Sequence, residues 1–160
     1  MSAESVRHFL LWIHYGLLGG WVGGIFFTAF AANPALDYSM VSKALSAQIQ
    51  GRMFRRFNLA ALGACFLLLT VIYSFFHLIP GKTAAIWKLL FSTGVMGIFT
   101  AYSLFALLPR MEDLKEAIPA LSIESQGQRE YDRLLHVYTG LQLLTGLLGL
   151  FILYGSVLTL

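Results

Sequence analysis

Two of the four histidines lie inside long apolar stretches of the sequence, at His14 and His77. An ionisable side chain within a hydrophobic span is costly, so both are candidates for a functional site. Neutral imidazole is a usual axial ligand of haem iron and also suits copper. The only cysteine, Cys65, lies in an apolar run, so we expect it to pack and predict no disulfide and no cysteine-based metal motif.

The composition is that of a membrane protein. The chain has 160 residues, of which 58% are hydrophobic and 12% are charged. In a soluble domain about one quarter of the residues are charged, so we expect this chain to be surrounded mainly by the lipid bilayer. The basic residues lie at the ends of apolar segments, where membrane topology accounts for them, and we predict no nucleic-acid binding.

Four apolar segments are each near the ~20 residues needed to cross a bilayer. They cover about residues 9–31, 57–79, 84–108 and 134–158. The sequence therefore predicts an all-α, integral membrane four-helix bundle, with residues 1–160 in a single domain. The small residues at 29–31 resemble a signal-peptide cleavage site, but the preceding apolar run is long, and we expect the first helix to be retained.

The connections carry the polar residues. Apolar residues recur every four positions before the second span, at Val41, Leu45, Ile49 and Met53. This pattern predicts an amphipathic helix between the first and second spans, either lying at the membrane interface or extending the second span. We expect Pro109 to end the third span, with a short charged helix over 111–118 and a flexible segment over 122–128.

The distribution of basic residues predicts the orientation. Three of them, Arg7, Lys82 and Lys88, lie on one side of the membrane. The other eight lie in the first and third connections: Lys43, Arg52, Arg55, Arg56, Arg110, Lys115, Arg129 and Arg133. Positive charge favours the cytoplasm, so we expect both termini outside, in the inner membrane of a bacterium.

This topology limits which histidines can share a ligand. His14 lies about 7–8 Å below the outer surface and His77 about one helical turn below it. Lys88 is close to them in depth, at about 6 Å, and is suited to meet a haem propionate. His136 is roughly 20 Å away, near the opposite surface, so it cannot share an ion with His14. We predict a site formed by His14, His77 and Lys88, with the two histidines as metal ligands.

Polar residues form a stripe on each of the later spans, and polar stripes in membranes usually face the bundle interior. The stripe on the second span contains Gly63, Thr70, Ser74 and His77. The stripe on the third span contains Lys88, Ser92, Met96, Thr100 and Ser103, and the stripe on the fourth span contains Tyr138, Gln142, Thr145, Gly149 and Ser156. His136 is outside the fourth stripe, and we expect it to be structural. No acidic residue lies in any span, which argues against a proton or cation carrier.

The glycines of the first span lie on the face opposite His14 and Trp21. They are Gly16, Gly19, Gly20, Gly23 and Gly24. Small residues let membrane helices approach closely, so Gly16, Gly20 and Gly24 predict a packing interface with a second copy or a larger membrane complex.

Several motifs resemble a small uncharacterised family of four-helix membrane proteins, a domain of unknown function. The first is His14 followed by Trp21-Val-Gly-Gly24, Phe26-Phe27 and Pro34; the others are Gly51-Arg52-Met-Phe54-Arg-Arg56-Phe57, Pro109-Arg-Met-Glu-Asp-Leu114 and Leu134-Leu-His136. The resemblance spans nearly the whole chain.

A more distant likeness is to the CopD and HemJ-like membrane proteins. It consists of His14 upstream of Trp-x-Gly-Gly, Arg56-Phe57 before the second span, and Lys88 in the third. The HemJ-like likeness implies haem handling and porphyrinogen oxidation around His14 and Lys88, and the CopD-like likeness implies copper uptake.

Two functions from different classes follow. The first is binding of a cofactor, b-type haem or alternatively copper, with a redox or metal-handling role. The chain offers no nucleophile–base pair, so any enzymatic activity would be that of a membrane oxidoreductase. The alternative is a cofactor-free accessory or assembly subunit that acts through its glycine face.

Overall fold

The computed structural model describes residues 3–32, 43–79, 81–117 and 126–159. Nearly all of these residues are helical. The elements are α1 (Ala3–Phe27), η1 (Thr28–Ala32), α3 (Lys43–Leu78), α4 (Thr83–Tyr102), η2 (Ser103–Leu107), α5 (Leu108–Ala117) and α6 (Gln126–Thr159), where η1 and η2 are short π-helical segments.

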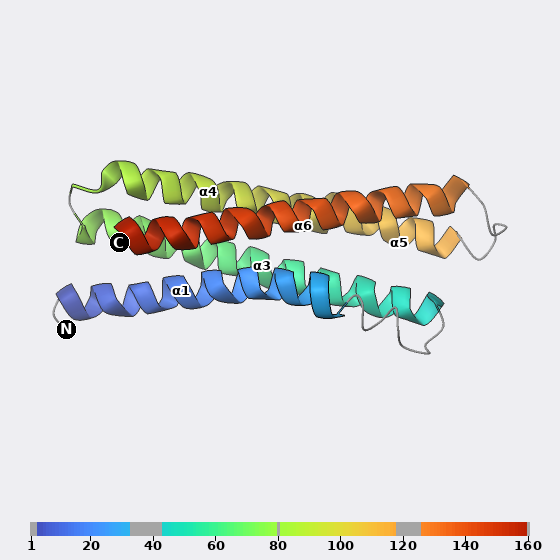
Figure 1. The fold of residues 1–160 in the computed structure, drawn as a ribbon, viewed down its shortest axis with the longest axis horizontal. Coiled ribbons are helices and arrows are strands. Elements are labelled where there is room, and N and C mark those ends of the chain that lie inside the picture. Colours follow the sequence, from blue (N-terminus) through green and yellow to red (C-terminus); the bar gives the residue numbers. More distant parts are fainter. Residues whose placement is uncertain (1–2, 33–42, 80, 118–125, 160) are drawn as a thin grey trace.

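The long helices lie side by side and alternate in direction (Figure 1). α3 contacts α4, α4 contacts α6, and α1 contacts both α3 and α6. α1 and α4 are therefore diagonal in the bundle. Both chain ends lie at the same end of the bundle, here named the termini end (Figure 1). The opposite end is named the arginine end, because Arg52, Arg110 and Arg129 lie there.

Four segments are long and apolar enough to cross a membrane: Glu4–Phe30, Ile49–Leu78, Thr83–Leu114 and Arg129–Leu158. This confirms the predicted integral membrane, all-α bundle of four helices. Large apolar side chains such as Trp12, Phe91 and Phe151 face outward, as expected for helices surrounded by lipid.

The structure decides between the two alternatives for the amphipathic segment before the second span. Residues from Lys43 onward belong to α3, a single helix of 36 residues. The amphipathic segment is therefore a polar extension of the second span and not a separate interfacial helix. Its first part, including Val41, lies outside the described residues, as do Asn33 and Pro34.

The prediction that Pro109 ends the third span is wrong. The chain continues from α4 through η2 into α5 without leaving helical geometry, and α5 ends at Ala117. Proline has no backbone N–H and therefore leaves one hydrogen bond unmade inside a continuous helix. Pro109 is the second residue of α5, directly after the π-helical segment η2, so the local register change accommodates it. Gln126, within the expected flexible segment, begins α6.

The interior consists of two clusters of buried apolar residues. The larger, at the termini end, draws on all four long helices and includes Leu18, Phe75, Ile86 and Ile152. The smaller, at the arginine end, is formed by α3, η2, α5 and α6, and includes Phe54, Leu107, Met111 and Tyr138. No residue of α1 belongs to the smaller cluster.

Candidate functional site

His14 lies inside the bundle. Its side chain is fully buried, and its Nε2 is hydrogen-bonded to the Ser156 Oγ at 2.9 Å. The imidazole ring also lies edge-on against Phe75, with ring centroids 6.3 Å apart. The Nδ1 atom is buried and has no hydrogen-bond partner among the described residues. His14 thus joins α1 to α6 through one polar contact and keeps one unpaired nitrogen.

His77 and Lys88 are not gathered with His14. Both side chains are exposed on the outside of the bundle. His77 follows the buried Phe75 by two residues, about 200° around the helix, and its ring packs on the exposed Tyr73. The structure therefore does not form the expected three-residue cluster in the interior.

The stripe predicted for the second span faces outward. Gly63, Thr70 and His77 are exposed, and Ser74 is half-buried. The Thr70 hydroxyl donates to the Phe66 carbonyl and the Ser74 hydroxyl donates to the Thr70 carbonyl, each at 2.9 Å. Because these hydroxyls are satisfied within their own helix, nothing drives them into the bundle.

The other stripes are largely placed as predicted. Every member of the fourth is buried, and the third is buried from Met96 onward through Thr100 and Ser103. Lys88 and the half-buried Ser92, nearer the termini end, are the exceptions. His136 is exposed, and its Nδ1 lies 2.6 Å from the Asp132 carbonyl oxygen of its own helix.

Sequence reasoning missed Asn58, which is the centre of a buried polar network. Its Nδ2 donates to the Tyr138 Oη at 2.8 Å and to the Phe54 carbonyl at 2.9 Å. Its Oδ1 accepts a hydrogen bond of 2.8 Å from the Gln142 Nε2. The available signal was spacing: Asn58 is seven residues before Cys65, which faces the core.

The glycine face of α1 divides into two parts. A Cβ atom added at Gly16, Gly19, Gly20 or Gly23 would meet no other atom within 4 Å, and these residues are exposed. We call these four the glycine ridge. Gly24 differs, because a Cβ there would collide with the Phe57 ring of α3. Of the three predicted interface glycines, Gly16 and Gly20 therefore lie on the ridge, whereas Gly24 packs within the chain.

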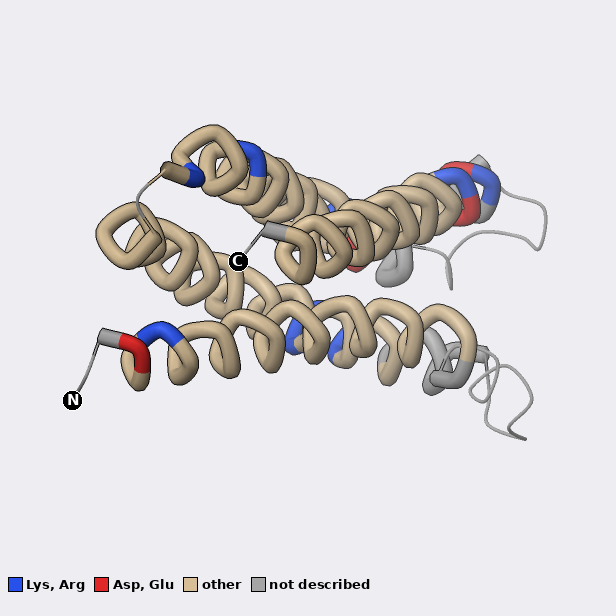
Figure 2. Tube along the Cα trace, turned by 60° about the vertical axis from the view of Figure 1, so that its left-hand side comes forward, with Lys and Arg blue, Asp and Glu red and all other residues tan. Residues whose placement is uncertain are grey.

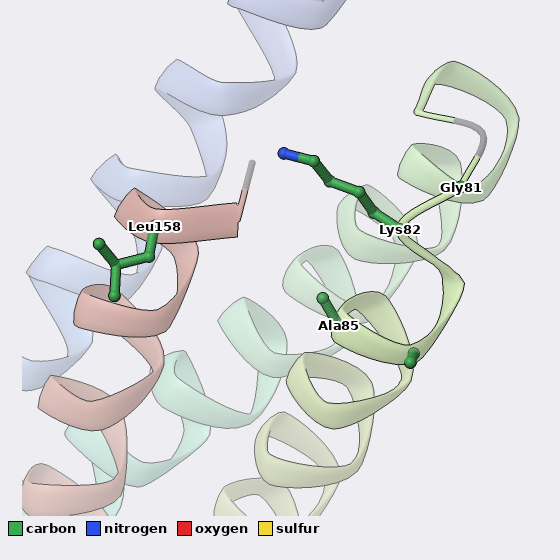
Figure 3. Close-up of a pocket in the computed structure, with 5 residues that line it drawn as sticks. Gly81, Lys82, Ala85 and Leu158 are labelled. Carbon is green, nitrogen blue, oxygen red and sulfur yellow. The ribbon is translucent and has the colours of Figure 1, made fainter.

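Two surface pockets lie at opposite ends of the bundle. The one at the termini end, of about 330 Å³, is lined by Lys82, Ala85 and Leu158 among others. Figure 3 shows Lys82 extending from the start of α4 toward the end of α6. The second, of about 570 Å³, lies at the arginine end between α6 and the η2–α5 region. Neither pocket includes His14, His77 or Lys88.

Metal sites with three or more protein ligands are a separate question. In the part of the chain that the structure describes, no group of three or more histidine, cysteine, aspartate or glutamate side chains is close enough to hold an ion.

The sequence from residue 16 to residue 120 matches the model of a family described as a domain of unknown function, DUF4149. The chain belongs to this family. The part matched to DUF4149 contains the glycine ridge, α3, α4 and α5, and stops before α6. No curated protein and no solved structure matches the chain.

Proposed function

We propose that this DUF4149 protein is a cofactor-free accessory or assembly subunit of a membrane complex, which binds a partner helix along the glycine ridge. The observation that carries the proposal is the outward position of Gly16, Gly19, Gly20 and Gly23, with open space over each of them. Helix association in lipid depends on close packing, and small residues on an exposed face permit it.

The surroundings of the ridge support this proposal. Trp12 and Phe27 lie four residues before Gly16 and four after Gly23, and their side chains are 80% and 64% exposed. Residues four apart lie on the same side of a helix, so the two aromatic rings flank a strip of exposed backbone. Such a strip, about 10 Å long from residue 16 to residue 23, suits one crossing helix.

The test is to fill the ridge. In Gly20→Leu, the added Cβ meets no other atom within 4 Å and the position is exposed, so we expect the bundle to fold but association to be lost. The matched controls are Gly63→Leu on α3 and Gly140→Leu on α6, which are exposed and equally free of neighbours. Crosslinking in native membranes and co-purification in mild detergent measure association. A wild-type protein that is monomeric and has no co-purifying partner, or equal loss in the controls, would contradict the proposal.

A second candidate is a b-type haem at His14, with a redox or haem-handling role. It is supported by the unpaired Nδ1 of a buried histidine, and by the distant likeness to HemJ-like proteins. The surrounding residues do not fit the group in this conformation, because His77 and Lys88 lie on the outside of the bundle and neither of the two pockets above reaches His14. Haem binding would require α1 and α6 to separate at the His14–Ser156 contact.

The absorption spectrum distinguishes this candidate. Purified wild-type protein should show a Soret band that His14→Ala removes, whereas His136→Ala serves as the control for loss of an exposed histidine. Protein that stays colourless after haem is added would exclude haem, and metal analysis of the same samples would then test copper.

A further inference from the structure

The pocket at the arginine end combines a charged mouth with an apolar wall. Arg110 of α5 and Arg129, Glu130 and Arg133 of α6 line one part of it. Leu107 of η2, Tyr102 of α4, and Leu134 and Val137 of α6 line the rest. Figure 2 shows basic and acidic residues gathered at the start of α6, beyond which the helix carries no charge.

The mouth of the pocket has an excess of positive charge. Arg110 Nη2 is 3.2 Å from the Glu130 carboxylate, so these two charges offset each other. Arg129 and Arg133 have no carboxylate within 4.0 Å among the described residues. Two guanidinium groups one helical turn apart thus remain available for an anion, and guanidinium groups match the geometry of phosphate oxygens.

The apolar wall extends from the mouth into the membrane-spanning part of the bundle. From Arg129 to Val137 the pocket follows α6 over about 12 Å, and Tyr102 lies at a similar distance from Arg110. Val137 and Tyr102 are 47% and 52% exposed, so this wall is open to the surrounding lipid. A free phosphate ion would use the mouth alone and leave the wall uncovered.

We propose that this pocket binds one anionic phospholipid, with its phosphate at Arg129 and Arg133 and an acyl chain along Leu134 and Val137. The charge complementarity at the mouth, continuous with an apolar wall at membrane depth, specifies this occupant. The site is formed by α4, η2, α5 and α6 and is independent of the glycine ridge on α1.

Lipid titration of the full-length protein, delipidated in non-ionic detergent, tests the proposal. Native mass spectrometry counts bound phosphatidylglycerol, phosphatidylcholine with the same acyl chains, and inorganic phosphate as the headgroup alone. We expect phosphatidylglycerol to bind at least tenfold more tightly than phosphatidylcholine and not to be displaced by equimolar phosphate. Equal binding of the two lipids, or displacement by phosphate, would overturn the proposal.

Removing the charges of the two arginines tests where the phospholipid binds. Each arginine near an anionic lipid contributes about fivefold in affinity, so Arg129→Gln with Arg133→Gln should weaken phosphatidylglycerol binding about thirtyfold. The control is Arg52→Gln with Arg56→Gln, which removes the same charge from exposed positions on α3. Equal weakening by both pairs would show non-specific attraction and overturn the proposed site.

A change in the wall tests the acyl-chain contact without altering charge. Val137→Trp places a bulky ring in the groove, and we expect it to weaken phosphatidylglycerol binding while leaving thermal stability unchanged. Leu144→Trp is the control, because Leu144 lies two turns further along the same face of α6 and is 45% exposed. Unchanged lipid binding in Val137→Trp would contradict the assignment of the wall.

Discussion

The two ends of the bundle are held together in different ways. At the termini end, four helices meet around an apolar cluster, with glycines such as Gly97 and Gly149 at contacts between helices. Its side-chain hydrogen bonds between helices include His14 with Ser156, and a longer contact of 3.6 Å from the Cys65 Sγ of α3 to the Thr93 carbonyl of α4. At the arginine end, α1 takes no part in the core, and α3 is joined to α6 by the Asn58–Tyr138–Gln142 network.

This difference shows that an unusual residue type in a membrane span need not be the one that forms most hydrogen bonds between helices. Histidine draws attention because it is rare and costly in a membrane span, yet His14 forms a single hydrogen bond here. Asparagine, tyrosine and glutamine are less conspicuous, but together they connect α3 to α6 through residues that are 80 or more positions apart in sequence. Where fewer helices pack, hydrogen bonds replace part of the missing close contact.

The largest expected effect concerns close packing at the termini end. At Gly149 of α6, a Cβ would collide with Val22 of α1 and lie 3.2 Å from the Met96 Cε. Gly149→Leu should therefore destabilise the fold by about 3 kcal/mol, the upper part of the usual overpacking range. Unfolding in mixed micelles with increasing SDS measures the change.

The matched control is Gly140→Leu at the arginine end of the same helix, where nothing lies within 4 Å of an added Cβ. We expect its stability to equal or exceed that of the wild type, because leucine favours helix over glycine. A similar loss at both positions would remove the contrast between the two ends.

The next effect is on the polar network. Asn58→Leu removes all three hydrogen bonds of the asparagine and leaves buried Tyr138 and Gln142 groups without those partners. At about 0.6 kcal/mol for each hydrogen bond in a membrane protein, we expect a loss of about 2 kcal/mol. SDS unfolding of Asn58→Leu, Gln142→Leu and the double variant measures it.

The double variant also tests whether the network acts as a unit. If Asn58 and Gln142 depend on each other, the combined loss should be smaller than the sum of the single losses. Strictly additive losses would show that the 2.8 Å contact between them contributes nothing.

The helices were predictable from sequence because length and hydropathy alone require them in a bilayer. The orientation of each helix was predictable only where large side chains decide it, as on the face of α6 that carries Tyr138 and Gln142. On α3, Thr70 and Ser74 resembled an inward stripe, but bonding to their own backbone lets them face lipid. The site prediction matched His14 and His77 by depth, and this stripe then suggested that His77 faces inward, whereas the structure places it on the outside of the bundle.

The same lesson applies to the helix boundaries. Proline normally marks the end of a helix, and only the π-helical register of η2 explains why the third span continues through Pro109. Ser103, Leu104 and Leu107 on η2 are buried, so this change of hydrogen-bond register lies against the packed interior of the bundle. No pattern in the local sequence specifies them.

The smallest expected effect is at the His14–Ser156 contact. Ser156→Ala removes one hydrogen bond between α1 and α6, while Val22 and Met96 still pack at the neighbouring Gly149. We expect a loss of about 0.6 kcal/mol, close to the average for one hydrogen bond in a membrane protein. Ser156→Thr, which keeps the hydroxyl, is the control. A loss in Ser156→Ala as large as that in Asn58→Leu would mean that His14 anchors the termini end, and that packing alone does not hold it.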